Sequence, residues 1–170
     1  IENSSFEHPI ESLYIKASGN QGREDIIAYL RNIIIHRCVG FPAIFLLKST
    51  VYFEEQNKIS FCELTEGIES AGSDSAYFTG GLLSLDSQVT FRGETTINNN
   101  KGEEGAAIQA HERSHLYMEG EITFKDNTAF NGGALSFYED SWMTIKHTTS
   151  MNFIMRQKRM QEISVNNFVQ

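Results

Sequence analysis

The chain has 170 residues, of which 40% are hydrophobic and 21% are charged, and its formal net charge is −8. This composition suits one domain with a hydrophobic core and excludes a disordered tract or a bundle of membrane helices. No stretch reaches the ~18 apolar residues of a transmembrane helix. A nucleic-acid partner is not expected, because it would need clustered Lys and Arg.

Residues 1–40 precede the clear sequence pattern, and we predict an N-terminal cap or a degenerate first coil of the repeat described next. Five apolar residues follow the spacing of one helix face, with Asp25 as a possible N-cap: Ile26, Ile27, Leu30, Ile33 and Ile34. A strand at residues 33–35 is the alternative. We favour the strand because the run is β-branched and Ile35 precedes Phe61 by one length of the repeat.

Three short phrases recur from the middle of the chain onward, and they begin at Gly80, Gly105 and Gly132. They are Gly80-Gly81-Leu82-Leu83, Gly105-Ala106-Ala107-Ile108 and Gly132-Gly133-Ala134-Leu135, after a weaker copy at Pro42-Ala43-Ile44. Each phrase is followed by a second alternating segment, and most by a third, which recur with nearly the same period. A regular period of about 25–27 residues is typical of a solenoid whose coils stack on one another.

Alternation within the three segments predicts which side chains point into the coil. The inward positions are apolar: Ile44, Leu83, Ile108 and Leu135; Val51, Val89, Leu116 and Met143; Phe53, Phe91, Met118 and Ile145; Phe61, Ile97 and Phe124. The outward positions are mostly small and polar: Ser84, Gln109 and Ser136; Thr90, Tyr117 and Thr144; Ser60, Thr96 and Thr123. We therefore predict an all-β, right-handed parallel β-helix over residues 41–153, with three strands in each coil of about 25–27 residues. A short helix could cap one or both of its ends.

Glycine and asparagine mark the predicted corners between segments. Gly105, Gly132 and Gly133 allow a tight turn or a close backbone approach. Asn100 and Asn127 each come shortly after the third segment, at the same place in the repeat. Because an asparagine amide can bond backbone groups of the coils above and below, we expect Asn127 to be buried at a corner and hydrogen-bonded to backbone.

The phrases Phe124-Lys125-Asp126-Asn127 and Gly132-Gly133-Ala134-Leu135 resemble the paired FxxN and GGA(I/L/V) motifs of polymorphic outer membrane proteins. The resemblance is clear over residues 80–145 and weaker over residues 42–61. One coil departs from it, with Ile97 in place of Phe and Ala106 in place of the second Gly. The family resemblance implies a parallel β-helix in a large surface protein.

Two segments interrupt or follow the repeat. The stretch from Phe61 to Gly80 is more than twice as long as its counterpart in the other coils, so an inserted loop is expected at about residues 66–76. It is either a binding excursion or a disordered insertion. Residues 154–170 lose the pattern and are expected to form a C-terminal cap or a tail. Cys38 and Cys62 lie close to one coil apart along the chain, and they could form either a disulfide or two buried free thiols.

Candidate chemistry is sparse. Asp86, Glu112, Glu139 and Asp140 fall in the turn after the first segment and could line up as an acidic ridge, for catalysis or weak calcium binding. Solvated turn carboxylates are the simpler interpretation. His111 and His115 have a metal-binding spacing only on a helix, which is not predicted there. We therefore nominate no catalytic, cofactor-binding or metal residue.

The predicted function is non-enzymatic: a repeat module of an extracellular or cell-surface protein that serves adhesion or display. A membrane would be reached only through segments outside this chain. Its partner would be a protein or glycan receptor, bound through outward residues of the second segment: Tyr52, Thr90, Tyr117 and Thr144. Two alternatives stay open, a carbohydrate-active enzyme similar to pectate lyases and a purely structural spacer.

Overall fold

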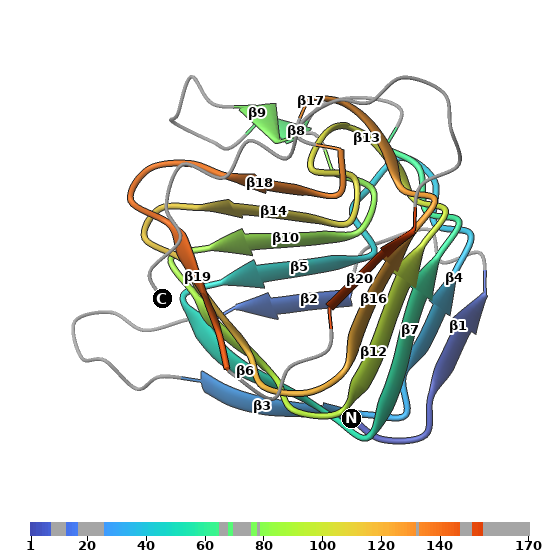
Figure 1. The fold of residues 1–170 in the computed structure, drawn as a ribbon, viewed down its shortest axis with the longest axis vertical. Coiled ribbons are helices and arrows are strands. Elements are labelled where there is room, and N and C mark those ends of the chain that lie inside the picture. The colour runs from blue at the N-terminus through green and yellow to red at the C-terminus, as the bar shows by residue number, and fades with distance from the viewer. Residues whose placement is uncertain are drawn as a thin grey trace.

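The computed structural model describes residues 1–7, 13–16, 26–64, 68–69, 76–77, 79–131, 133–146 and 151–154. Three parallel sheets form three sides of a coil, and each coil adds one strand to each sheet (Figure 1). Among the described residues no helix occurs. The predicted all-β, right-handed parallel β-helix is confirmed.

The first sheet has five parallel strands, which Figure 1 shows stacked along the axis of the solenoid. They are β2 (Leu13–Lys16), β5 (Ile44–Leu47), β10 (Leu82–Leu85), β14 (Ile108–His111) and β18 (Leu135–Phe137). The second sheet also has five. They are β3 (Ile26–Arg31), β6 (Ser49–Glu54), β11 (Gln88–Phe91), β15 (His115–Met118) and β19 (Trp142–Ile145).

The third sheet has six parallel strands. They are β1 (Ser5–Glu7), β4 (Ile34–His36), β7 (Gln56–Ser60), β12 (Glu94–Asn98), β16 (Ile122–Lys125) and β20 (Met151–Ile154). A short parallel pair, β13 (Lys101–Glu104) with β17 (Thr128–Asn131), leads back toward the first sheet. The N-terminal strands β1 to β4 belong to these same sheets, so residues 26–31 and 34–36 form strands and not the alternative helix.

The predicted insertion contains a small antiparallel pair, β8 (Ile68–Glu69) with β9 (Ala76–Tyr77). Figure 1 places it at one end of the strand stack formed by the first sheet. The remaining residues of the predicted loop, and residues 155–170 of the predicted tail, lie outside the described residues.

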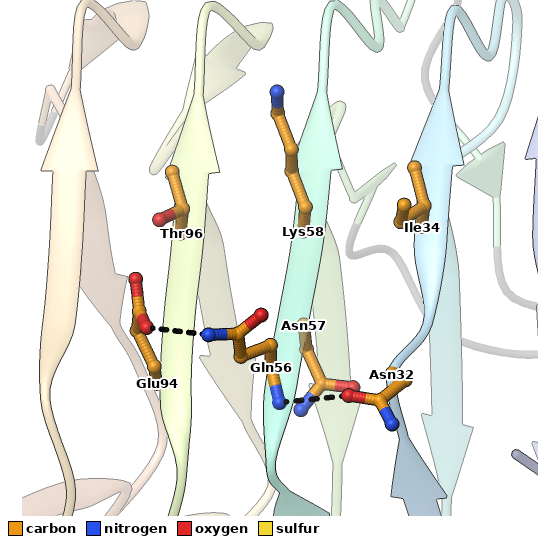
Figure 2. A pocket seen from close by; sticks show the side chains of 7 residues that line it. All are labelled: Asn32, Ile34, Gln56, Asn57, Lys58, Glu94 and Thr96. Carbon is orange, nitrogen blue, oxygen red and sulfur yellow. Dashed lines mark hydrogen bonds between the residues drawn. The ribbon is translucent and has the colours of Figure 1, made fainter. Parts of the chain in front are cut away.

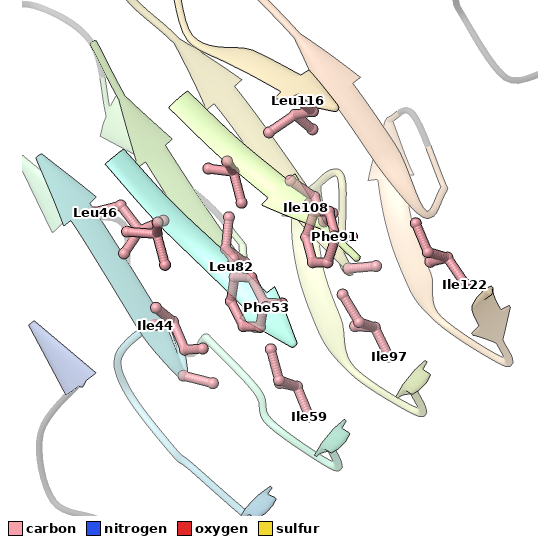
Figure 3. Close-up of a cluster of buried hydrophobic side chains, with 14 of the residues drawn as sticks. Ile44, Leu46, Phe53, Ile59, Leu82, Phe91, Ile97, Ile108, Leu116 and Ile122 are labelled. Atoms are coloured by element: carbon pink, nitrogen blue, oxygen red, sulfur yellow. The ribbon is translucent and has the colours of Figure 1, made fainter. Parts of the chain in front are cut away.

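The inward side chains pack into one continuous core (Figure 3). On the second sheet, Val51, Val89 and Leu116 follow one another in register and are fully buried, as predicted. Phe53 and Phe91 stack with ring centroids 4.7 Å apart. Apolar burial of this kind is the main force that holds the coils together, since one coil cannot bury its own apolar faces.

On the first sheet the predicted register is wrong by one residue in β10. Leu82, and not Leu83, stands between Ile44 and Ile108 in the inward column. The reason is a backbone contact: a Cβ on Gly81 would lie 2.1 Å from the carbonyl oxygen of Ala107. Only glycine fits there, so the coil from β10 to β14 is one residue longer than the glycine phrases predict.

This shift reverses two predicted orientations. Ser84 points inward beside Ala110 and is fully buried, with its hydroxyl donating to Ser114 Oγ at 3.1 Å. Leu83 and Leu85 point outward and form a second buried cluster with Phe45. Outward residues Gln109 and Ser136 are buried as well, so the outer face of the first sheet is not the exposed polar surface that the sequence predicts.

On the third sheet Phe61 was predicted to point inward, and this is wrong. Ile59 takes that place, in register with Ile35 and Ile97. Phe61 is 50% exposed and adopts a left-handed backbone with φ of 58° at the corner after the strand. Ser60, predicted to face solvent, is buried and bonds His36 Nδ1 at 2.9 Å.

Candidate functional site

The outer face of the second sheet carries the outward column predicted from the sequence. Tyr52, Thr90, Tyr117 and Thr144 follow one another in register on β6, β11, β15 and β19. Tyr29 on β3 extends the same column by one coil. Thr90 is only 7% exposed, so the larger side chains on either side of it form the accessible part of the column.

One end of this face is a stack of flat groups. The rings of Tyr29 and Tyr52 are nearly parallel, with centroids 5.1 Å apart. The guanidinium of Arg92 lies 4.2 Å from the Tyr52 ring centroid, a cation–π contact. Arg31 lies 5.2 Å from the Tyr29 ring centroid. The ring faces are therefore largely occupied, and the hydroxyl ends and ring edges are what a partner could meet.

The other end of the face is an aromatic cluster around His115. Its ring contacts two others, with centroids 3.7 Å from that of Tyr117 and 4.5 Å from that of Trp142. His115 Nε2 makes a 2.8 Å hydrogen bond with Thr144 Oγ1. Burial lowers the pKa of His115 below its usual value, which favours the neutral ring. Trp142 is 36% exposed at the edge of the cluster.

We call this surface the aromatic face and define it as the outward side chains of Tyr29, Tyr52, His115, Tyr117 and Trp142. Sequence reasoning identified Tyr52 and Tyr117 but missed the other three. Tyr29 lay in a segment whose helix or strand nature was ambiguous. His115 and Trp142 occupy a neighbouring outward column, in register with each other, two positions before the predicted one.

A ladder of alternating charges borders the aromatic face at the end of the second sheet. Glu54 lies between Arg31, at 2.8 Å, and Arg92, at 3.4 Å. Glu119 likewise lies between Arg92, at 3.6 Å, and Lys146, at 2.6 Å. Hydrogen bonds to Glu54 and Glu2 raise the pKa of Arg31. Glu54 and Glu119 thus each have a cation in the coil on either side.

The predicted structural asparagines form a ladder at the corner after the third sheet. Asn100 Oδ1 accepts the backbone N–H of Cys62 at 2.9 Å, and Asn127 Oδ1 accepts that of Asn100 at 3.1 Å. Asn127 Nδ2 donates to the carbonyl of Ile97 at 2.7 Å. The expected backbone bonds of Asn127 are present, although its side chain is half-buried and only Asn100 is fully buried.

The other motif residues are structural too. Phe124 is 2% exposed in the core. Gly105 and Gly133 have positive φ of 51° and 45°, a conformation that favours glycine. Gly132 lies outside the described residues. These positions explain how the coil turns and provide no group for a ligand.

A serine ladder that the sequence analysis did not predict holds the corner between the first two sheets. Four buried serines take part: Ser49, Ser87, Ser114 and Ser141. Each hydroxyl oxygen of the later three accepts the backbone N–H of the serine one coil earlier, at 3.1, 3.3 and 3.0 Å. In the sequence, these serines stand out because each lies two residues before the first apolar residue of the second segment of its coil. Their role is structural.

The candidate acidic residues lie at that same corner but do not form an obvious reaction centre. Asp86 pairs with Arg113 at 3.3 Å, and Glu139 lies 3.9 Å from His111 Nδ1. Asp86, Glu112, Glu139 and Asp140 all have positive φ, as expected at a tight turn. Among the described residues, no group of three His, Cys, Asp or Glu side chains is placed to hold a metal ion.

A shallow groove of about 410 Å³ lies on the outer face of the third sheet (Figure 2). Its wall includes Asn32, Gln56 and Glu94, which bond across coils: Gln56 N–H donates to Asn32 Oδ1, and Gln56 Nε2 donates to Glu94 Oε2, both at 3.2 Å. Lys58 and Ile34 also line it and are exposed. The groove has no aromatic anchor, and the side chains of Asn32, Gln56 and Glu94 are already engaged in these hydrogen bonds.

Within the described part of the chain, no helix has the length and apolar character needed to cross a membrane. In comparison with known proteins, the chain matches no protein-family model, no curated protein and no solved structure.

Proposed function

We propose that this chain is a non-enzymatic binding module of an extracellular or cell-surface protein, and that it holds a receptor through the aromatic face. The observation that carries the proposal is the run of outward aromatic side chains on one sheet, from Tyr29 to Trp142, beside paired cations. Tyr, Trp and Arg are the residues that most often dominate binding at protein interfaces. The resemblance to surface-protein repeats supports the same assignment.

A protein receptor is favoured over a glycan. A sugar ring binds an aromatic side chain by lying flat on an open ring face. Here Tyr29 stacks on the Tyr52 ring, Arg92 lies over the same ring, and Tyr117 and Trp142 both contact His115. Tyr52 therefore offers a partner its ring edge and phenol hydroxyl, and these suit the mixed polar and apolar surface of a protein.

The parallel strands also make the face rigid. Tyr52 and Tyr117 sit on strands hydrogen-bonded to neighbours on both sides, so their backbone does not need to be ordered on binding. Tyrosine adds large contact area with few rotatable bonds. Little conformational entropy is then lost when a partner docks.

The test is a binding screen of the purified chain against immobilised extracellular-matrix proteins and a glycan array. Tyr117→Ala and Trp142→Ala each remove part of the aromatic face, and Thr96→Ala on the third sheet is the matched control. We expect saturable protein binding that weakens at least tenfold in both face variants and is unchanged in the control, with all melting temperatures alike. Binding that survives both face variants would refute the proposed face.

The enzymatic alternative has its own assay. The purified chain is incubated with neutral and acidic polysaccharides with calcium present, and reducing ends or unsaturated products are followed. Sustained product release that is lost in Asp86→Ala or Glu112→Ala would overturn the non-enzymatic proposal. Binding with no detectable turnover would support a binding module over a carbohydrate-active enzyme. Saturable binding of any partner would also distinguish a binding module from a purely structural spacer.

A further inference from the structure

The two cysteines occupy the corner column that asparagine occupies in later coils. Val39 pairs with Glu63, and the backbone N–H of Glu63 donates to the carbonyl of Cys38 at 2.8 Å. Cys38 and Cys62 are therefore direct neighbours on consecutive coils. The column continues with Asn100, which accepts the N–H of Cys62.

The Cys62 sulfur already lies against Cys38. The backbone N–H of Cys38 donates to Cys62 Sγ at 3.4 Å, and both residues are buried, at 2% and 0% exposure. Equivalent residues on adjacent parallel strands have Cα atoms about 4.8 Å apart. Disulfides span Cα distances of roughly 4.4–6.8 Å. In the structure both thiols are free.

We propose that Cys38 and Cys62 are a modification site, and that they form a disulfide tying two consecutive coils when the chain folds in the presence of a low-molecular-weight disulfide such as oxidised glutathione. In those coils a covalent bond would replace the amide ladder of Asn100 and Asn127. The inference concerns the corner after the third sheet and is independent of the aromatic face on the second.

The chemistry balances as thiol–disulfide exchange. The thiolate of one cysteine attacks one sulfur of oxidised glutathione, which forms a mixed disulfide and releases one glutathione thiolate. The thiolate of the other cysteine then attacks the cysteine sulfur of that mixed disulfide, forms the internal S–S bond and releases the second glutathione. Two cysteine thiols are oxidised, one disulfide is reduced to two thiols, and the two protons pass to the released glutathione.

The native environment disfavours ionisation of Cys38. Contact with Cys62, together with burial, raises the pKa of the Cys38 thiol. Because both cysteines are buried in the folded chain, we expect the disulfide to form during folding. Once the coils have closed, oxidation should be slow.

The experiment refolds the full chain from denaturant with either oxidised or reduced glutathione. We expect the oxidised product to be about 2 Da lighter, to resist iodoacetamide in denaturant, and to melt about 5–10 °C higher. Trypsin without reductant should leave residues 38–48 and 59–92 joined in one species that reductant separates. Cys38→Ser is the matched control, and it should show neither the linked peptides nor the rise in melting temperature.

Any of three outcomes would overturn the inference. Both cysteines still react with iodoacetamide after oxidative refolding, each cysteine carries a stable glutathione, or the chain forms disulfide-linked dimers. None of these results depends on receptor binding, so the failure of this inference and the failure of the proposed function are distinguishable.

Discussion

At the scale of single residues, alternation along the strands separates core positions from surface positions. Phe124 is 2% exposed, whereas its neighbour Thr123 is half-buried on the outer face. Phe124→Ala should lower the free energy of unfolding by about 3–5 kcal/mol, because it removes contacts and leaves a cavity. Thr123→Ala should change it by no more than about 0.5 kcal/mol. Urea titrations that give equal losses for the two variants would contradict the alternation.

Asn127 tests the corner ladder. Asn127→Leu removes the acceptor of the Asn100 N–H and the donor to the Ile97 carbonyl. We expect a loss of about 1–3 kcal/mol, because buried backbone groups lose their partners. Asn127→Asp keeps the acceptor and should lose less. A thermal melt in which the Leu variant equals the unmodified chain would show that the ladder adds no stability.

His111 gives a pH dependence. Burial lowers the pKa of His111 to about 4, against an ordinary value of 6.5, while Glu139 is largely exposed and 3.9 Å away. The unfolded state therefore binds more protons between about pH 4 and 6.5, and stability falls as the pH falls through this window. The loss attributable to His111 is up to about 3 kcal/mol.

The measurement is the free energy of unfolding at pH 7 and pH 4.5 for the unmodified chain and for His111→Asn. The variant should lose less stability on acidification, because it has no ring to protonate. Equal losses would mean that His111 does not contribute to the acid sensitivity.

At the scale of elements, the charge ladder links strands that are consecutive in space but unevenly spaced in sequence. Glu54 lies 23 residues after Arg31 and 38 residues before Arg92, yet it contacts both. Its carboxylate neutralises two guanidinium groups that would otherwise repel each other across the coils.

Glu54→Gln should therefore lower the melting temperature at low salt, and Glu54→Lys should lower it further by placing three cations in a row. Both differences should shrink at about 1 M NaCl, because exposed charges are then screened. Glu94→Gln on the third sheet is the control, since its partner there is an amide and not a cation. If the melting temperature of Glu54→Lys is lowered equally at low and high salt, the destabilisation comes from altered packing and not from charge repulsion.

At the scale of the whole molecule, the solenoid is stabilised by contacts between neighbouring coils. Strand β12 is paired on both sides, with β7 and β16, whereas among the described strands β1 is paired with β4 alone. Hydrogen exchange should accordingly be slowest at Thr96 and Ile97 and faster in β1, because an end coil can open without breaking the centre. Uniform protection from β1 to β16 would contradict this coil-by-coil picture.

Much of the fold could be predicted from the sequence. The second sheet needed nothing more than the constant period of the repeat and strict alternation: Val89, Leu116 and Met143 are in the expected register. The predicted outward column is present as well: Thr90, Tyr117 and Thr144 follow the constant period, and alternation places Tyr52 in the same column across the insertion. The resemblance to polymorphic outer membrane protein repeats, the surface location and the receptor stay predictions.

The sequence by itself determined the class of fold. Each repeat has three strands with alternating apolar and polar residues, and one repeat is too short to bury its own apolar faces. Stacking of successive coils as parallel strands buries them. Only the tertiary structure decided the register of β10, since the close approach of Gly81 to Ala107 is a contact between coils. It also decided the partners of Arg92 and His115, because these side chains meet across coils. For Arg92 and Glu54, which lie 38 residues apart, the insertion between β7 and β10 also hides the spacing along the chain.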